Sequence, residues 1–352
     1  MLKKELIYLR LFLKNINKLR SNLFQFLIIT KQCISLNLHL PKGGLFMNKD
    51  LLRMDNLSKE EILDLLNLAD QLKYEQKHGI EHHLLKGKSL GMIFEKASTR
   101  TRVSFEVGMY QLGGHPLFLS SKDLQIGRGE PIQDTARVLS RYLDGIMIRT
   151  FSQKGIETLA ECSSIPIING LTDDEHPCQI LADLMTIREK KLILEGLKVA
   201  YIGDGNNMCN SLIIGCLTLG MNISIANPIG YKPPKYYIEK GIALAEENDV
   251  SFEMTEDPKI AIKNADVIIT DVWASMGQED EAKKRQIAFE GYQVNSEIMK
   301  LANDDSIVLH CLPAHREEEI TEEVLEAHAD EIFEEAENRL HAQKAVLVKL
   351  LS

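Results

Sequence analysis

The sequence has no C-x-x-C pair among its six cysteines, and it has no apolar run long enough to cross a bilayer. The cysteines are scattered, at Cys33, Cys162, Cys178, Cys209, Cys216 and Cys311. This scatter predicts reduced thiols in a cytoplasmic protein and excludes a disulfide framework or a zinc-ligand spacing. Basic residues are outnumbered, with 41 Lys and Arg against 51 Asp and Glu. That balance argues against a general nucleic-acid binder, which needs clustered basic residues.

Acidic residues are nearly missing from residues 1–46, where eight Lys or Arg accompany only Glu5. A basic, acid-poor start is typical of an organellar presequence. We favour another explanation, because Lys42-Gly43-Gly44 can be encoded by a bacterial ribosome-binding sequence and Met47 follows it closely. We therefore expect residues 1–46 to be an extension outside the fold and Met47 to be the true start.

From Asn48 onward, short apolar segments alternate with amphipathic ones. Ser58 and Glu61 form a capping box at the start of the first expected helix. Expected strands are Ser89–Phe94, Pro116–Leu119, Gly145–Ile148, Pro166–Asn169, Lys198–Ile202, Asn222–Ala226, Ser251–Met254, Val267–Thr270 and Ile307–His310. Wholly apolar strands that alternate with helices predict an α/β fold of two doubly wound parallel-sheet domains with helices on both faces.

The length of 352 residues predicts two domains. We expect the first to comprise residues 47–190 together with 336–352, and the second to comprise residues 191–335. The hinge is expected near Glu195 and Gly196. The last helix, about Ala336–Leu350, is expected to pack back on the first domain.

The stretch Ser98-Thr99-Arg100-Thr101 follows the first expected strand and precedes the expected helix Val103–Leu112. A helix N-terminus offers free N–H groups and partial positive charge, so it can bind an anion. A hydroxyl that merely caps the helix, with the arginines in solvent, is the alternative. Capping needs only one hydroxyl and does not explain Arg100 or Thr101. We therefore predict an oxyanion or phosphate site, although the pattern is not that of a nucleotide P-loop.

Other polar clusters also follow expected strands, where ligands bind in open α/β sheets. They are Arg149, His176-Pro177-Cys178-Gln179, Asp271–Gly277 and His310–Arg316. Each has an ordinary structural explanation when taken alone. Arg149 could be a surface ion-pair partner, His176 a core histidine, and Cys311 a small buried apolar residue.

Taken together and in this order, the clusters resemble the aspartate/ornithine carbamoyltransferase superfamily. The matching segments are S-T-R-T-R at 98–102, Arg149, H-P-C-Q at 176–179, G-D-G-N-N at 203–207, D-V-W-A-S-M-G at 271–277, H-C-L-P-A-H-R at 310–316 and Arg339. The resemblance extends from about Met47 to the end of the chain and leaves the first 46 residues unmatched.

The resemblance implies a site for carbamoyl phosphate and a site for ornithine. The implied carbamoyl phosphate contacts are Ser98, Thr99, Arg100, Thr101, Gln125, Arg149, His176, Pro177, Cys178, Gln179, Cys311, Leu312 and Arg339, with Gln125 reaching over from a neighbouring subunit. The implied ornithine contacts are Asn207, Asp271, Ser275 and Met276. Arg100, His176 and Cys311 are the implied catalytic residues. A homotrimer is implied, while no metal, organic cofactor, nucleic acid or membrane is expected.

The acceptor amine follows from Asp271, because a carboxylate suits an α-ammonium group. An N-acylated ornithine lacks that charge, and putrescine lacks the α-amino acid end. Aspartate would need a cation for its second carboxylate, which Ser275-Met276-Gly277 does not offer. Ornithine therefore fits best, with the other amines as alternatives. The attacking amine must lose a proton, and the resemblance implies that Cys311 receives or relays it.

Two positions depart from the family pattern, namely Glu317, where bacterial relatives usually have glycine, and Ala97, where a hydroxyl residue is common. A dinucleotide-dependent oxidoreductase is a rival hypothesis, since Gly203–Met208 follows a strand. It is disfavoured because the third glycine is missing and no acidic residue ends the next strand. A non-catalytic relative is disfavoured by the complete set of reactive residues.

Overall fold

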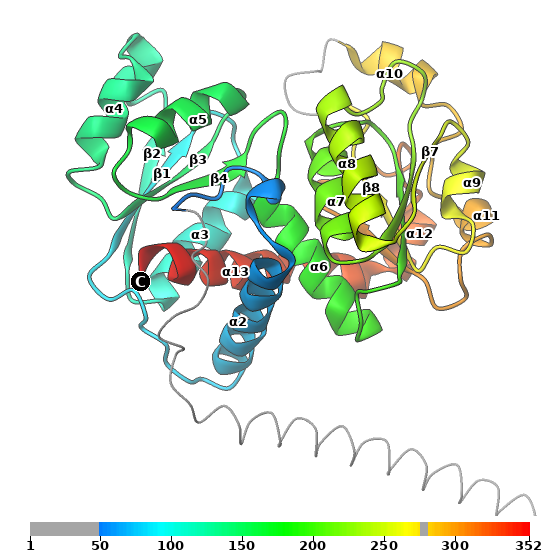
Figure 1. Cartoon of the computed structure of the whole chain (residues 1–352), viewed down its shortest axis with the longest axis horizontal. Coiled ribbons are helices and arrows are strands. Elements are labelled where there is room, and N and C mark those ends of the chain that lie inside the picture. The colour runs from blue at the N-terminus through cyan, green and yellow to red at the C-terminus, as the bar shows by residue number, and fades with distance from the viewer. Residues whose placement is uncertain (1–48, 275–280) are drawn as a thin grey trace, which may run out of the picture. The chain divides into compact units, whose positions relative to one another are not determined.

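The computed structural model describes residues 49–274 and 281–352 of the chain (Figure 1). These belong to a unit that spans residues 47–352. The expectation for residues 1–46, and the expected ornithine contacts Ser275 and Met276, lie outside the described residues. Within the described part of the chain, no helix is long and apolar enough to cross a membrane.

The first sheet has four parallel strands in the order β2-β1-β3-β4. Their bounds are β1 Ser89–Phe94, β2 His115–Ser120, β3 Gly145–Arg149 and β4 Ile167–Leu171. The two strands β3 and β4 are buried along their whole length, as expected for apolar strands covered on both faces.

The second sheet has five parallel strands in the order β7-β6-β5-β8-β9. Their bounds are β5 Lys198–Ile202, β6 Asn222–Ala226, β7 Phe252–Thr255, β8 Val267–Thr270 and β9 Ile307–His310. The predicted fold class, with two doubly wound parallel sheets, is thereby confirmed. The boundaries of the two predicted domains stay a prediction.

The described helices cover both faces of the sheets (Figure 1). They are η1 Met54–Asn56, α2 Lys59–Lys77, α3 Thr99–Gln111, η2 Gln125–Arg128, α4 Ile132–Leu139, α5 Gln153–Cys162, α6 Pro177–Lys191, α7 Asn207–Thr218, α8 Lys235–Asn248, α9 Pro258–Ile262, α10 Ala282–Ala288, α11 Ser296–Met299, α12 Glu322–Ala327 and α13 Ala329–Leu351. The predicted capping box of Ser58 and Glu61 is present at the start of α2. Helix α6 leads from the first sheet to the second.

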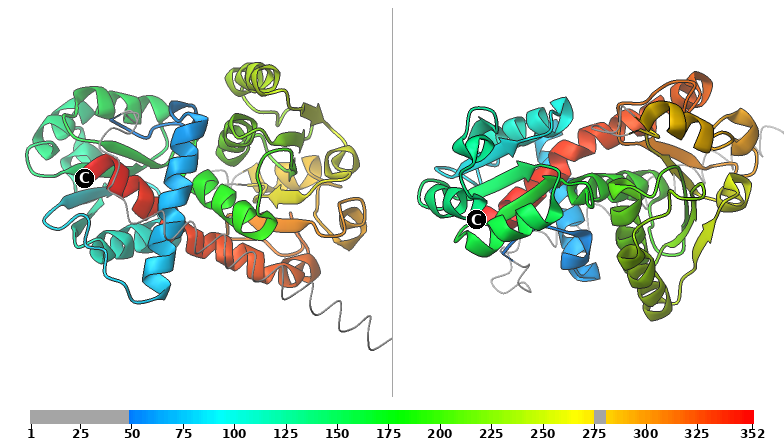
Figure 2. Two further views of the ribbon diagram at one scale, coloured as in Figure 1. Left: turned by 60° about the horizontal axis from the view of Figure 1, so that its bottom comes forward. Right: turned by 90° about the horizontal axis from the view of Figure 1, so that it is seen from above.

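The last helix, α13, packs against α2, α3 and α6, as predicted, and also contacts β9 (Figure 2). It begins at Ala329 and not near Ala336. The first turns are acidic, with Asp330 and Glu331, so they show little apolar periodicity in the sequence. Acidic side chains near a helix N-terminus interact favourably with its partial positive charge, which is why these turns are helical.

Candidate active site

A cleft of about 1050 Å³ lies where the carboxyl ends of strands from both sheets meet. Of the predicted site residues, it is lined by Ser98, Thr99, Arg100, Thr101, Arg149, His176, Asn207, Asp271, Cys311, Leu312 and Arg339. Most of these residues lie at or shortly after the carboxyl ends of β1, β3, β4, β5, β8 and β9. Open α/β sheets bind ligands at this edge.

The stretch Ser98–Thr101 forms the N-terminus of α3, which begins at Thr99 and not at Val103. The hydroxyl of Ser98 accepts a hydrogen bond from the Thr101 N–H at 3.2 Å, so Ser98 caps the helix. The arginine that follows does not extend into solvent, because the Arg100 guanidinium donates to the Leu312 carbonyl across the cleft. The helix start therefore combines a cap with a cation directed at the second sheet.

The guanidinium groups of Arg100, Arg149 and Arg339 line the same cleft. Burial, together with the charges of Arg339 and Arg100, lowers the pKa of Arg149 to about 10. Burial also lowers the pKa of Arg339. The Nε of Arg149 is buried without a hydrogen-bond partner among the described residues. Like charges held close together, with donors unused, provide a binding site for an anion of more than one charge.

Gln179 does not line the cleft but joins α6 to α13 beneath it. Its Oε1 accepts from Arg339 Nη1 at 2.6 Å, and its Nε2 donates to Asp183 Oδ1 at 2.9 Å and Glu335 Oε1 at 2.8 Å. Glu335 also accepts from the His310 N–H at 2.8 Å, next to Cys311. Burial and the neighbouring Asp183 raise the pKa of Glu335 well above its ordinary value.

His176 is the N-cap residue of α6, and Pro177 occupies the first helical position as predicted. Burial, and then the charges of Arg339, Arg149 and Arg100, lower the pKa of His176 well below its ordinary value. The imidazole is thus neutral at pH 7. A neutral imidazole has one N–H and can donate to a developing negative charge without adding another cation to the site.

Pro177 and Cys178 are the first two residues of α6 and do not line the cleft. The Cys178 thiol donates to the Asn169 carbonyl at 3.4 Å, and burial raises its pKa to about 12. Gln125 is an exposed residue of η2 and is also absent from the cleft lining. Contacts of these residues with carbamoyl phosphate stay predictions.

On the side of the second sheet, the Cys311 thiol donates to the Asp271 carboxylate, with 3.1 Å between Sγ and Oδ1. Asn206 Nδ2 donates to the other oxygen, Oδ2, at 2.8 Å. Burial, and then Asp271, raise the pKa of Cys311 well above its ordinary value. Cys311 is therefore a neutral thiol at pH 7 and is not a resting thiolate.

Asn207, the first residue of α7, donates from Nδ2 to the Thr172 carbonyl at 2.6 Å. Its neighbour Asn206 caps the same helix by accepting from the N–H groups of Met208 and Cys209. The G-D-G-N-N segment thus places one asparagine beside Asp271 and the other at the cleft wall.

The group Asp271, His310 and Cys311 holds three potential metal-ligand atoms within 4.8 Å of one another. Both ring nitrogens of His310 are already used, however. Nδ1 accepts from the Leu312 N–H at 2.9 Å, and Nε2 lies 3.0 Å from Glu319 Oε1. This histidine holds the loop that follows β9 and is a poor candidate for a metal ligand.

Sequence reasoning missed two charged pairs that line the cleft. Lys96 pairs with Asp173, and its Nζ lies 4.4 Å from the centre of the Phe151 ring. Arg285 donates from Nη1 to Asp204 Oδ2 at 2.6 Å and to the Trp273 carbonyl at 2.8 Å. Lys96 stands in the same segment as Arg100, which was a usable signal.

Glu317 adopts a left-handed conformation, with a φ of 67°. This conformation explains why glycine suits the position. The Glu317 side chain accepts from the Glu322 N–H at the start of α12, at 2.9 Å, which offsets part of the strain.

Family comparisons agree with this geometry. The model described as aspartate/ornithine carbamoyltransferase, carbamoyl-P binding domain, matches residues 49–189, and the corresponding Asp/Orn binding domain matches residues 195–350. The chain belongs to the aspartate/ornithine carbamoyltransferase family. The resemblance predicted from the sequence is thereby confirmed.

Several members of this family are similar to the chain over most of its length. The ornithine carbamoyltransferase of Carboxydothermus hydrogenoformans is 55% identical over 311 residues, which are 87% of this chain and 98% of that one. The one from Anoxybacillus flavithermus is 57% identical over 303 residues, 86% of this chain and 96% of that one. Among solved structures, the ornithine carbamoyltransferase from Pyrococcus furiosus has a TM-score of 0.83 at 52% identity, covering 86% of this chain and 96% of that one.

Proposed function

We propose that the chain transfers the carbamoyl group of carbamoyl phosphate to the side-chain amine of L-ornithine, giving L-citrulline and phosphate. The observation that carries this proposal is that one cleft contains both the guanidinium groups of Arg100, Arg149 and Arg339 and the carboxylate of Asp271. Relatives named ornithine carbamoyltransferase, at 55% and 57% identity, support ornithine as the acceptor. The reaction would be a step of arginine biosynthesis in the cytoplasm.

The phosphate of carbamoyl phosphate binds at the N-terminus of α3, where Ser98, Thr99 and Thr101 stand beside Arg100 and Arg149. Charge-assisted hydrogen bonds of this kind contribute about 1.5–3 kcal/mol each. They stabilise phosphate as the leaving group. The mutual repulsion of the guanidinium groups is relieved when the anion binds.

The carbamoyl oxygen gains negative charge as the amine attacks. Arg100, His176 and Thr101 are the donors that can stabilise it, and one such donor lowers the barrier by about 3 kcal/mol. Carbamoyl phosphate is already activated, so this chemistry requires no metal and no organic cofactor. Leu312 and Arg339 also line the cleft and are proposed to lie at the carbamoyl end of the ligand. The predicted contacts of Pro177, Cys178 and Gln179 would be at this carbamoyl end too.

Asp271 pairs with the α-ammonium group of ornithine, with Asn207, Ser275 and Met276 completing its site. The side-chain amine starts protonated, and making it neutral at pH 7 costs roughly 4–5 kcal/mol for a group of pKa near 10.4. Cys311 is itself a protonated thiol at pH 7, so it cannot accept this proton without giving up its own. It relays the proton instead, accepting the proton of the amine while its own proton passes to the departing phosphate, and Asp271 holds the thiol in place through its hydrogen bond.

A homotrimer, with Gln125 of one subunit serving the site of the next, is part of the proposal. Its support is the apolar face of α3, where Val103, Val107 and Tyr110 are 49%, 37% and 76% exposed. Gln125 is exposed as well. Light scattering after size-exclusion chromatography tests the subunit number, and a monomer would contradict this part.

The two predicted domains, residues 47–190 with 336–352 and residues 191–335, are retained as the carbamoyl phosphate and ornithine domains. Their support is that β1–β4 belong to one sheet and β5–β9 to the other.

The deciding experiment is colorimetric citrulline formation from carbamoyl phosphate and ornithine, run beside aspartate, putrescine and N-acetylornithine. We expect turnover with ornithine and a far lower rate with the other three amines. Comparable or faster turnover with another amine would replace the proposed acceptor. No turnover with any of them would overturn the proposed activity.

A further inference from the structure

Glu175 is a buried carboxyl that the proposed reaction does not use. It lies between β4 and α6, directly before His176, and its side chain is 0% exposed. Oε2 accepts from the Ser211 hydroxyl at 2.5 Å and from the Met54 N–H at 3.3 Å. Ser211 belongs to α7 beside the second sheet, and Met54 to η1 near the first. One carboxyl therefore connects two elements that are distant in the sequence.

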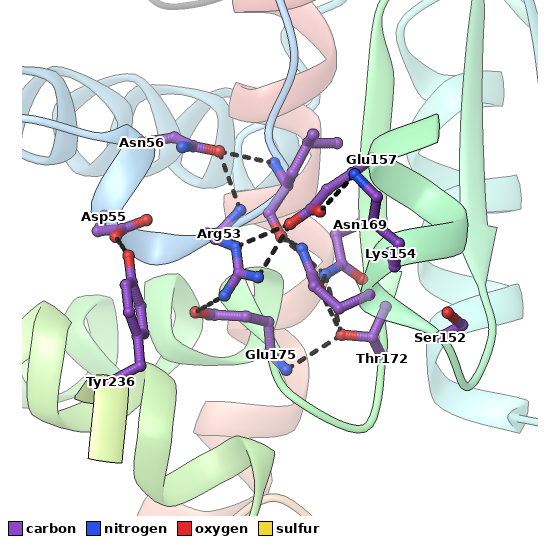
Figure 3. Close-up of polar contacts among 12 residues, drawn as sticks. Arg53, Asp55, Asn56, Ser152, Lys154, Glu157, Asn169, Thr172, Glu175 and Tyr236 are labelled. Atoms are coloured by element: carbon purple, nitrogen blue, oxygen red, sulfur yellow. Dashed lines mark hydrogen bonds and ion pairs between the residues drawn. The ribbon is translucent and has the colours of Figure 1, made fainter. Parts of the chain in front are cut away.

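Arg53 lies beside the carboxyl of Glu175, with its Nη1 4.0 Å from Oε1 (Figure 3). Arg53 is itself held by Glu157, to which it donates from Nε and Nη2 at 3.2 and 2.9 Å. Thr172 fixes the backbone of Glu175, because its hydroxyl accepts from the Glu175 N–H at 3.1 Å and its N–H donates to the Glu175 carbonyl at 2.9 Å. The carboxyl is thus held from several directions.

Ser211 connects Glu175 to the backbone of His176. Its hydroxyl donates to Glu175 and accepts from the His176 N–H at 2.9 Å. A hydroxyl has a single proton, so the bond to Glu175 directs its lone pairs at His176. Among the residues that the structure describes, the side chain of His176 makes no cap hydrogen bond of its own. The backbone from which the imidazole enters the cleft is therefore held by Ser211.

We propose that Glu175 and Ser211 are positioning residues that hold His176 in place for carbamoyl transfer. This inference rests on the proposed function, in which His176 donates to the carbamoyl oxygen. Displacing a donor by a fraction of an ångström weakens it at the transition state more than in the bound substrate, because the charge is greatest there. Loss of the Ser211 hydroxyl should therefore lower kcat and leave the KM for ornithine nearly unchanged.

The first test compares Ser211→Ala with Ser224→Ala. Ser224 is a matched control, since it is 1% exposed and its hydroxyl donates to Glu253 at 2.8 Å, away from the cleft lining. We expect Ser211→Ala to lower kcat about tenfold, the effect of losing one hydrogen bond, while Ser224→Ala keeps the kcat of the unaltered chain. Equal kcat values for both variants and the unaltered chain would overturn the inference.

The second test is a double-mutant cycle with His176→Gln. If Ser211 acts through His176, then Ser211→Ala lowers kcat in the unaltered chain but causes no further loss when His176 is already replaced. Independent losses that multiply would show that the role is structural and would overturn the inference. Glu175→Gln is measured in the same cycle, so the result does not depend on the folding of one variant.

The two proposals fail separately in these experiments. Citrulline formation by the unaltered chain decides the proposed function before any variant is made. If the unaltered chain is active and Ser211→Ala is equally active, the positioning role alone is wrong.

Discussion

The thiol of Cys311 donates to the carboxylate of Asp271 across 3.1 Å, and the pKa of the thiol is raised by burial and by this carboxylate. The two residues follow neighbouring strands, β9 and β8, whose register places His310 opposite Thr270. The pair is therefore a product of the parallel sheet, and it brings a proton donor and a proton acceptor to the proposed ornithine site.

Replacing Cys311 with alanine should lower kcat at least about 100-fold, because a positioned proton-transfer group contributes about 10²–10⁴-fold. Steady-state citrulline formation measures the loss. Cys162→Ala is the control, since Cys162 is a half-buried thiol of α5 outside the cleft lining. Full activity of the Cys311 variant would exclude the relay.

The pH dependence follows from the same pair. Ornithine must lose a proton from a group of reference pKa near 10.4, and the raised pKa of Cys311 means that the thiol supplies no extra thiolate near neutrality. The reactive, deprotonated form therefore becomes more abundant with pH, and kcat/KM should rise between about pH 7 and 9. A flat profile over that range contradicts the proton-loss account.

Replacing Arg100 with glutamine should lower kcat/KM about 10²–10³-fold without loss of folding stability. The reason for the second expectation is that Arg100 adds to the positive charge that lowers the pKa of Arg149, so its removal relieves repulsion. Steady-state citrulline formation measures the loss of kcat/KM, and thermal unfolding with and without inorganic phosphate measures folding stability and phosphate binding. Phosphate should raise the Tm of the unaltered chain and have a much smaller effect on the variant.

The shared-site trimer predicts complementation between two inactive variants. Arg100→Gln damages a site from within its own subunit, whereas Gln125→Ala damages the site of the neighbour. Co-expression should form mixed trimers in which some sites contain neither substitution, so activity should return to a measurable fraction of that of the unaltered chain. Mixed trimers that remain inactive would show that Gln125 does not act between subunits.

The sequence predicted the strands well because each is a short apolar run with polar ends. The bounds of β5, at Lys198–Ile202, and of β6, at Asn222–Ala226, agree with the prediction. Gln179, which the resemblance implies as a carbamoyl phosphate contact, is a different case. Its side chain bonds Arg339, which lies 160 residues later on α13, and no local pattern reports such a tertiary partner.

The ion pairs around the cleft were missed for the same reason. Arg285 reaches Asp204 over 81 residues of sequence, although both line one cavity. Residues directly after strands were found because the fold places every strand end at one edge, whereas the residues that hold them in place are set by packing between elements. Ser211 and Glu175 are of this second kind.

Glu175→Gln should raise the free energy of unfolding of the chain, although the same substitution is expected to lower activity. Burial raises the pKa of Glu175 from 4.5 to about 7, so the folded chain favours the protonated carboxyl. This contribution to stability is complete below about pH 4.5 and is lost as the pH rises through about 7.

Glu175→Gln, which cannot ionise, should therefore gain free energy of unfolding relative to the unaltered chain between pH 5 and 8, by up to about 3 kcal/mol. Urea unfolding at several pH values measures the gain, with Glu161→Gln as the control substitution at an exposed carboxyl. A variant that is more stable at pH 8 yet slower in citrulline formation would separate the positioning of His176 from support of the fold. A difference in unfolding free energy that stays constant with pH would contradict the raised pKa.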